Sequence, residues 1–244
     1  MATAYTCKED LGPIPPPGKV PIHMFTTSDK NVSCIGFKGG IQFKIPYMSE
    51  NGNAIESIAL PNRYTVSGDC NTTLNGYYSQ KIVIGFYNSW KLTIYFSSDV
   101  QQNEILAREN VTKYHISQIE LDYDFNNNLF TNAVDKIVGT KNKAVATNLN
   151  TLSTDEDKSY MCKKNTSFNI QNGLSMIIKE LQFQAFKNES SPGFSSAVNC
   201  KDSGDNYVLL ISTGAALGGL LLLVVVLGIV HVHKKRQSYQ RITF

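Results

Sequence analysis

The sequence is poor in the residues and motifs from which enzyme active sites are usually built. Its 244 residues include four histidines, and only His23 and His115 lie before the long apolar run near the end of the chain. It contains no GxSxG, no HExxH, no glycine-rich phosphate loop and no aspartate-rich calcium loop. Each histidine is therefore more simply explained as an isolated residue. We predict no enzyme, no cofactor and no metal, and keep a hydrolase only as the weakest hypothesis.

An excess of charge of either sign is also missing. The 23 basic residues are nearly balanced by 20 acidic ones, and four basic residues follow the apolar run, which leaves 19 against 20 before it. Such a balance gives no basic face for nucleic acid and no acidic surface for polycations. We therefore predict no nucleic-acid partner.

One long stretch has no charged residue at all. Residues 208–230 read VLLISTGAALGGLLLLVVVLGIV, and as a helix they would extend roughly 34 Å. Because the hydrocarbon core of a bilayer is about 30 Å thick, this length is enough to cross it with modest tilt. The run predicts a transmembrane helix over 207–230.

The charges that flank this helix predict its orientation. Positively charged residues mark the cytosolic side of a membrane span. We predict a single-pass type I protein, with the preceding residues in the lumen or outside the cell and 231–244 as a cytosolic tail. The basic cluster also offers a contact for membrane lipid, although its role in orientation explains it more simply. The flanking charges are Asp202 and Asp205 before the helix, and Lys234, Lys235, Arg236 and Arg241 after it.

The first 21 residues lack the pattern of a folded domain. Residues 12–21 read GPIPPPGKVP, and proline fixes φ and removes amide donors, so the segment is either a hinge or stalk or a disordered tail. The N-terminus also lacks the apolar core of a signal peptide, which a lumenal domain of this size needs. We expect that a signal peptide is missing, and that Cys7 pairs with a missing residue.

Alternating apolar and polar residues dominate the predicted lumenal domain, 22–204. A period of two is typical of half-buried strands, and turns rich in Asn, Gly and Ser separate the runs. Short amphipathic strands bury their apolar faces in two packed sheets, so we predict an all-β domain. Residues 87–89 are expected to form a hairpin turn, 130–143 either a short helix or a loop, and 148–159 an exposed connection. The predicted strands contain Ile41, Phe43, Ile45 and Tyr47; Ile82, Ile84 and Phe86; Trp90, Leu92, Ile94 and Phe96; Ile119, Leu121, Tyr123 and Phe125; and residues 167–170, 175–178 and 181–186.

Four cysteines of this domain, Cys34, Cys70, Cys162 and Cys200, are well separated and form no CxxC pair. Zinc ribbons and thioredoxins use such pairs, so we expect neither. In an oxidising lumen disulfides are the expected state, and four cysteines allow three connectivities.

Three segments resemble a known family. Residues 159–162 read SYMC, residues 181–186 read LQFQAF, and residues 194–200 read FSSAVNC. They resemble the SYxC motif, the strand ending in QAF and the run into the last cysteine of the lysosome-associated membrane glycoproteins. The resemblance covers about residues 20–244. It is to members with one lumenal domain, such as macrosialin, rather than two, although macrosialin's Ser/Thr/Pro-rich stalk is absent from this sequence.

The resemblance implies a fold and a disulfide pairing. Domains of this family are β-prisms in which each cysteine bonds the next along the chain. This implies that Cys34 bonds Cys70 and that Cys162 bonds Cys200, with 35 and 37 residues between the partners.

The tail contains a match to the YxxΦ sorting signal. Tyr239 and Ile242 are spaced so that an extended peptide can place both side chains in two pockets of a clathrin adaptor. In the family, glycine usually precedes the tyrosine and the bulky apolar residue ends the chain. Here Ser238 precedes, while Thr243 and Phe244 follow, which leaves endosomes or the cell surface open as locations beside the lysosome.

Five Asn-x-Ser/Thr sequons lie in the predicted lumenal part of the chain. Chance accounts for most of them in so Asn-rich a sequence, so it is the predicted topology that makes us expect glycans there. In the family such glycans shield the membrane and the protein from hydrolases. The acceptors are Asn31, Asn71, Asn110, Asn165 and Asn188.

Gly214 and Gly218 form a GxxxG pattern in the predicted helix. Small residues at this spacing allow helices to pack closely, so a homo-oligomer or a partner membrane protein is one interpretation. The other is that both glycines are tolerated in lipid without a partner.

Two functions of different classes are consistent with these features. The first is a type I lysosomal or late-endosomal membrane glycoprotein with a structural role in the glycocalyx, sorted by its tail. The second is a sorting chaperone or receptor, in endosomes or at the cell surface, that binds another membrane protein or an autophagy client.

Overall fold

Strands make up most of the described chain. The computed structural model describes residues 20–29, 32–101, 111–126, 128–149, 152–187 and 193–200. The predicted helix at 207–230, the tail at 231–244 and residues 1–19 lie outside them. Within the described residues, no helix is both long and apolar enough to cross a bilayer. The strands are β1 (His23–Asp29), β2 (Val32–Ser49), β3 (Gly52–Ala59), β4 (Thr65–Leu74), β5 (Tyr77–Phe86), β6 (Trp90–Gln101), β7 (Lys113–Asp124), β8 (Lys141–Thr147), β9 (Ser153–Asp155), β10 (Ser159–Cys162), β11 (Thr166–Asn169), β12 (Ser175–Gln184) and β13 (Ala197–Asn199), with a 3-10 turn, η1 (Gln171–Gly173).

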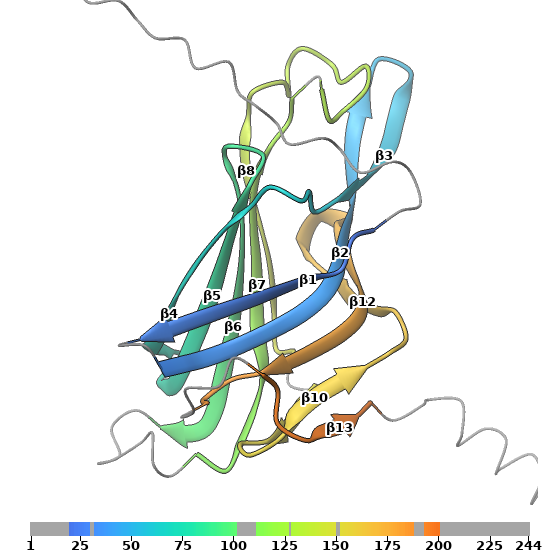
Figure 1. Ribbon diagram of the computed structural model, residues 1–244. Helices are drawn as coiled ribbons and strands as arrows, with labels where there is room; N and C mark the ends of the chain where they lie inside the picture. Colours follow the sequence, from blue (N-terminus) through green and yellow to red (C-terminus); the bar gives the residue numbers. More distant parts are fainter. Residues whose placement is uncertain are drawn as a thin grey trace, which may run out of the picture. The chain divides into compact units, whose positions relative to one another are not determined.

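The strands form two sheets, as predicted (Figure 1). The first sheet has the order β1-β2-β12-β10-β13, with β3 paired to β2 and β11 paired to β12. The second sheet has the order β4-β5-β6-β7-β8, with β9 paired to β7. The pairing of β10 with β13 is parallel, whereas β2 pairs antiparallel with β1, β3 and β12. The described residues therefore form the all-β domain that the alternating pattern predicts.

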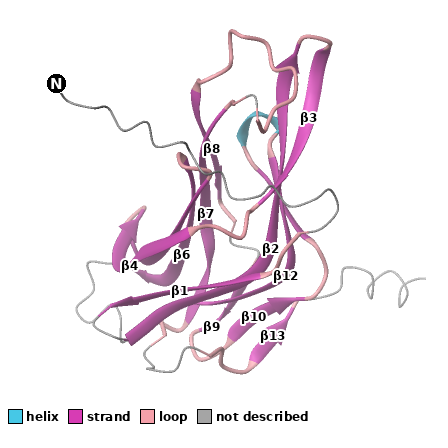
Figure 2. Ribbon diagram, turned by 45° about the horizontal axis from the view of Figure 1, so that its top comes forward, coloured by secondary structure: helices cyan, strands magenta, loops and turns pink. Residues whose placement is uncertain are grey.

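Strand β2 is the spine of the first sheet. Along one edge its first half pairs with β1 and its second half with β3, while β12 pairs along the opposite edge. Figure 2 shows β3 and the end of β2 as a hairpin that projects past the body of the sheet. The predicted alternation is confirmed, because Ile41, Phe43 and Ile45 are completely buried. These apolar side chains of the second half of β2 point into the core.

Aromatic rings from both sheets meet in the core. Phe43 of the first sheet stacks on Phe86 of the second at a ring distance of 6.0 Å, and Phe183 lies 5.5 Å from Phe96. Trp90, which is 1% exposed, contacts Phe86 at 5.7 Å and donates its indole N–H to Asp124 at 2.7 Å. Burial of such large rings supplies a large share of the apolar stabilisation of a domain of this size.

The hairpin turn predicted at 87–89 is confirmed. Phe86 pairs with Trp90, and the two residues after Phe86 take positive φ values, 43° at Tyr87 and 60° at Asn88. The amide of Ser89 closes the turn by donating to the Tyr87 carbonyl at 2.7 Å. Positive φ lets the tight turn follow the right-handed twist of the two strands.

The sequence predicts either a short helix or a loop at 130–143. These residues form turns, followed by the start of β8. Phe130 leaves the turn and stacks on Trp90 at 6.2 Å, fully buried. The amide of Glu50 donates to the Asn132 carbonyl at 2.9 Å, so this loop is attached to the tip of the β2–β3 hairpin. The buried ring of Phe130 and the hydrogen bond to the hairpin hold this loop in place without a helix.

The prediction of an exposed connection at 148–159 is wrong in part. Strand β9 lies inside it and pairs with β7, where Thr154 stands opposite Tyr114. Thr154 is 5% exposed and Ser159 is completely buried. The prediction rested on the polar side chains of this segment. Its backbone nevertheless pairs at the edge of the second sheet, which buries some of its hydroxyl groups.

Candidate functional site

The first disulfide joins the two sheets. Cys34 lies on β2 of the first sheet and Cys70 on β4 of the second, and their Cα atoms are 5.8 Å apart. Both residues are buried, at 1% and 5% exposure. The pairing implied by the family resemblance is therefore present, and it fixes the distance between the sheets at this edge.

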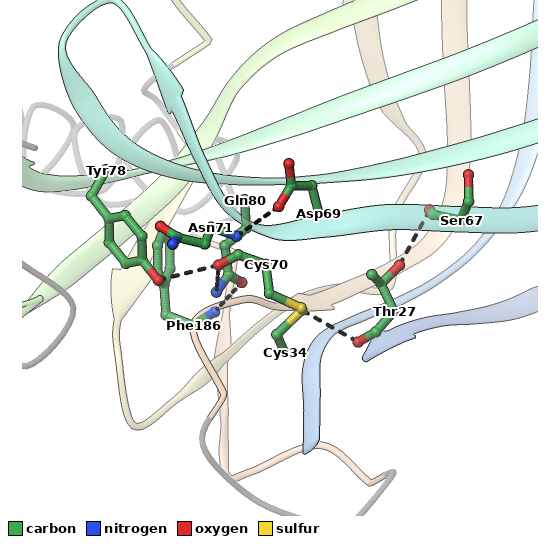
Figure 3. Close-up of a disulfide and its surroundings, with 9 residues drawn as sticks. All are labelled: Thr27, Cys34, Ser67, Asp69, Cys70, Asn71, Tyr78, Gln80 and Phe186. Atoms are coloured by element: carbon green, nitrogen blue, oxygen red, sulfur yellow. Dashed lines mark hydrogen bonds between the residues drawn. A yellow bond between two sulfur atoms is a disulfide. The ribbon is translucent and has the colours of Figure 1, made fainter. Parts of the chain in front are cut away.

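A buried glutamine continues this connection (Figure 3). The carbonyl of Cys70 accepts hydrogen bonds from the Tyr78 hydroxyl and from Gln80 Nε2, both at 3.1 Å. Gln80 Oε1 in turn accepts the amide N–H of Phe186 at 2.8 Å. Gln80 is completely buried, so its amide group satisfies a backbone group of β4 and one of the segment after β12 out of reach of solvent. A lone Gln in a strand carries no recognisable signal, so this residue could not be predicted from the sequence.

Strands β1 and β4 approach closely beside this disulfide. The Thr27 hydroxyl donates to the Ser67 carbonyl at 3.3 Å. A Cβ on Gly68 would lie 2.3 Å from the Lys81 carbonyl oxygen and 2.7 Å from the Thr27 side chain. Cys34 Sγ also lies 3.4 Å from the Thr27 carbonyl oxygen, a contact only, since a bonded sulfur has no proton to donate. The edge between the sheets therefore has room for glycine alone at position 68.

The second disulfide closes one end of the domain. Cys162 of β10 bonds Cys200, the residue after β13, with their Cα atoms 5.0 Å apart. The amide of Cys200 donates to the Met161 carbonyl at 2.7 Å. This bond stays within the first sheet, so it fastens the last described residue to a strand of the sheet and does not join the sheets.

The LQFQAF segment has a structural role in the same region. Gln184 Nε2 donates to the Ser195 hydroxyl at 2.8 Å, and Gln184 Oε1 accepts the Ser195 amide at 2.8 Å. The ammonium group of Lys187, which is 3% exposed, donates to the Gly193 carbonyl. Both residues therefore hold the segment that leads into Cys200.

The SYMC segment meets LQFQAF across the sheet. Ser159 donates to the Ser195 carbonyl at 3.0 Å and accepts a hydrogen bond from Gln182 Nε2 at 3.1 Å. Tyr160 stacks on Phe183 with a ring distance of 5.1 Å. The three segments that carry the family resemblance thus form one connected cluster around the second disulfide.

Two of the predicted glycan acceptors lie within the described residues. Asn71 follows Cys70 on β4 and Asn165 precedes β11, and both side chains are exposed. The backbone amide of Asn71 donates to Asp69 Oδ1 at 2.9 Å, and this bond does not occupy its exposed side chain. The other predicted sites lie outside the described residues: Asn31, Asn110, Asn188, Tyr239, Ile242, Gly214 and Gly218.

The two histidines before the apolar run lie on different sheets and do not form a catalytic pair. His23 lies on β1 against the ring of Tyr64 at 5.0 Å, whereas His115 lies on β7 of the other sheet. Burial lowers the pKa of both imidazoles. Among the residues that the structure describes, no group of three or more His, Cys, Asp or Glu side chains could hold a metal ion.

Sequence comparisons match most of the chain to one family. The family model described as "Lysosome-associated membrane glycoprotein 2-like, luminal domains" matches residues 12–201. Lysosome-associated membrane glycoprotein 1 of Cricetulus griseus is 24% identical over 239 residues, which cover 94% of this chain and 52% of the relative. Lysosome-associated membrane glycoprotein 2 of Homo sapiens is 26% identical over 139 residues, 55% of this chain and 31% of the relative. The chain thus spans about half the length of the first of these relatives.

Solved structures share the fold. Human lysosome-associated membrane protein LAMP-3 superposes with a TM-score of 0.56 at 16% identity, covering 75% of this chain and 100% of that chain. The membrane-proximal domain of mouse LAMP-1 gives a TM-score of 0.56 at 16% identity, covering 76% of this chain and 100% of that chain. The chain belongs to the family of lysosome-associated membrane glycoproteins, which are structural glycoproteins and not enzymes.

Proposed function

We propose that this protein is a single-pass type I membrane glycoprotein of late endosomes and lysosomes. It lines the lumenal face of the membrane as part of a glycan coat, and the signal at Tyr239 and Ile242 delivers it there. The observation that carries the proposal is the domain itself: a disulfide-closed pair of sheets of this family, with two sequon asparagines exposed on its surface.

The chemistry of the domain suits an acidic compartment. The Asp99 carboxylate accepts hydrogen bonds from the amides of Thr112 and Lys113 at 3.1 and 3.2 Å, and from the Thr112 hydroxyl. Burial acts to raise the pKa of this carboxyl, but the hydrogen bonds outweigh burial and lower the pKa from its usual value. A lowered pKa in the folded state contributes stability that is present above the usual pKa of the carboxyl and is lost as the pH falls from there through the lowered value. The contribution therefore persists at mildly acidic pH.

The delivery step is tested by the Tyr239→Ala variant. With a signal peptide supplied, we expect the full-length protein in acidic, hydrolase-containing vesicles and most of the variant at the cell surface, because the adaptor pocket loses its aromatic ligand. Imaging together with surface biotinylation measures both locations, and Thr243→Ala serves as the matched control. If parent and variant both collect at the surface, the tail does not act as a lysosomal signal and the sorting-chaperone hypothesis takes precedence.

The glycan coat is tested at the two exposed acceptors. We expect Asn71→Gln and Asn165→Gln each to remove the mass of one glycan on a denaturing gel, since both side chains are open to the transferase. Asn169→Gln, an exposed asparagine outside any sequon, should leave the mass unchanged. Equal migration of all variants, together with insensitivity of the parent to a peptide N-glycosidase, would rule out the coat.

A further inference from the structure

The outer face of the second sheet contains a cavity that the proposed function does not use. Its volume is about 470 Å³, and it is lined by residues of β5, β6 and β7 and of the segments next to them. The alternation of β7 places Tyr114 and Ile116 in the core, so His115 between them faces outward. The residues on which the argument rests are Tyr77, Ser97, Asp99, Lys113, His115 and Ser117.

A row of serine hydroxyls crosses the sheet, and two of its members, Ser97 and Ser117, line this cavity. Ser79 and Ser97 lie 2.9 Å apart through their hydroxyl oxygens, and Ser97 donates to Ser117 at 2.7 Å. Ser79 is completely buried and Ser97 is 4% exposed. Each hydroxyl has one proton but two lone pairs, so the row keeps acceptor capacity after its internal hydrogen bonds are made.

The rim combines one aromatic ring with polar groups of both signs. Tyr77 is 40% exposed, which is unusual for a ring of this size in the described domain. Asp99 and Lys113 bring opposite charges, so the cavity has no excess of either. Burial lowers the pKa of His115, and a neutral imidazole offers one donor and one acceptor. The lining thus provides donors, acceptors and one flat apolar face.

These groups select a class of ligand. An acyl chain needs continuous apolar walls, and a phosphate needs an excess of donors or positive charge, neither of which this cavity offers. A sugar ring has hydroxyls that both donate and accept, and an apolar C–H face that packs on an aromatic ring. We propose that this cavity is a binding site for a neutral saccharide, with Tyr77 as the stacking platform and Ser97, Ser117, His115 and Asp99 as hydrogen-bonding partners.

Saturation-transfer NMR tests the site with two probes, N,N′-diacetylchitobiose and mannotriose. The full-length protein is used in a detergent without a sugar headgroup, before and after removal of its own Asn-linked glycans. We expect transfer to the ring protons of at least one probe. Tyr77→Ala should reduce it on the order of tenfold, as expected for loss of an aromatic stacking contact, while Tyr77→Phe retains it. Transfer only after glycan removal identifies a glycan of this chain as the occupant, whereas equal transfer in both forms identifies an external saccharide.

Controls separate the site from general effects on the sheet. Tyr95→Ala removes another outward-facing ring of β6 that does not line the cavity, and it should leave transfer unchanged. If Tyr77→Ala fails to fold, judged by the fluorescence of Trp90, His115→Ala replaces it with the same expected loss. Absence of transfer to either probe from either form of the protein overturns the proposal, as does transfer that is equal in the parent and in the cavity variants.

Discussion

Replacing Cys34 and Cys70 together by alanine is expected to lower the free energy of unfolding by about 4 kcal/mol in the chain-entropy model of disulfides. The bond closes a loop with a sequence separation of 36 and joins strands of different sheets, so its loss frees the unfolded chain. Urea unfolding followed by the fluorescence of Trp90 measures the change. Trp90 is the single tryptophan of the sequence and is buried between the sheets, so it reports on the core.

The matched control is the removal of Cys162 and Cys200. This bond has a similar sequence separation of 38, but it fastens only the short strand β13 and Cys200 to β10. Without it, β13 can detach while the two sheets stay packed, so we expect a smaller shift in the Trp90 transition. Equal shifts in both double variants would contradict a special role for the bond between the sheets. An unchanged midpoint for Cys34→Ala/Cys70→Ala would contradict any stabilising role.

Phe183→Ala is expected to cost about 4 kcal/mol of folding stability through loss of buried surface and a residual cavity. Phe183 is completely buried, and its ring lies 5.5 Å from Phe96, 6.1 Å from Tyr114 and 5.1 Å from Tyr160. Because these neighbours come from three strands and both sheets, they cannot all move inward to fill the space. Thermal and urea unfolding of the purified protein measure the loss.

Two variants accompany this test. Phe183→Leu keeps most of the apolar volume and should lose clearly less stability than the alanine variant. Val198→Ala changes a residue that is 40% exposed and should stay within about 0.5 kcal/mol of the parent. A Phe183→Ala protein as stable as Val198→Ala would mean that the ring does not connect the sheets.

The strands that could be predicted are those in the middle of the sheets. The residues of β5 and β6 that point into the core alternate with neighbours that are polar or at least partly exposed, because only one face of each strand meets the core. The inward-pointing residues include Ile82, Ile84, Leu92 and Ile94. Burial of that face makes the period of two visible in the sequence. These positions are all completely buried, which confirms the prediction.

Two of the strands that were missed, β3 and β4, lie at sheet edges and bury few of their side chains. Strand β4 reads TVSGDCNTTL, and most of its side chains are exposed or partly exposed. Strand β3 buries only its last two residues, Ile58 and Ala59. Both strands are held by backbone pairing in hairpins, β3 with β2 and β4 with β5, and backbone pairing leaves no mark in local composition.

The residues of the candidate site also differ in how far the sequence predicts them. The sequons predict Asn71 and Asn165 as glycan acceptors, and both side chains are exposed in the folded domain. Their glycosylation stays a prediction. The disulfide partners came from family resemblance, since four cysteines leave three pairings open. The role of Gln80 could not be predicted from the sequence, because it depends on the backbone groups of Cys70 and Phe186, which only folding brings together.

The two disulfides also determine how tension would travel through the chain. A pull on the polypeptide on either side of the domain enters at Cys34 and crosses directly to Cys70, then follows the chain to Cys162 and leaves through Cys200. Most of β2 and all of β12, the central strands of the first sheet, lie inside the two bypassed loops and bear no load. Strands β1 and β10 of the first sheet and most of the second sheet lie in series with the force. A mechanical load would therefore act on β1, β10 and the second sheet, while the loops that contain β2 and β12 could not be extended.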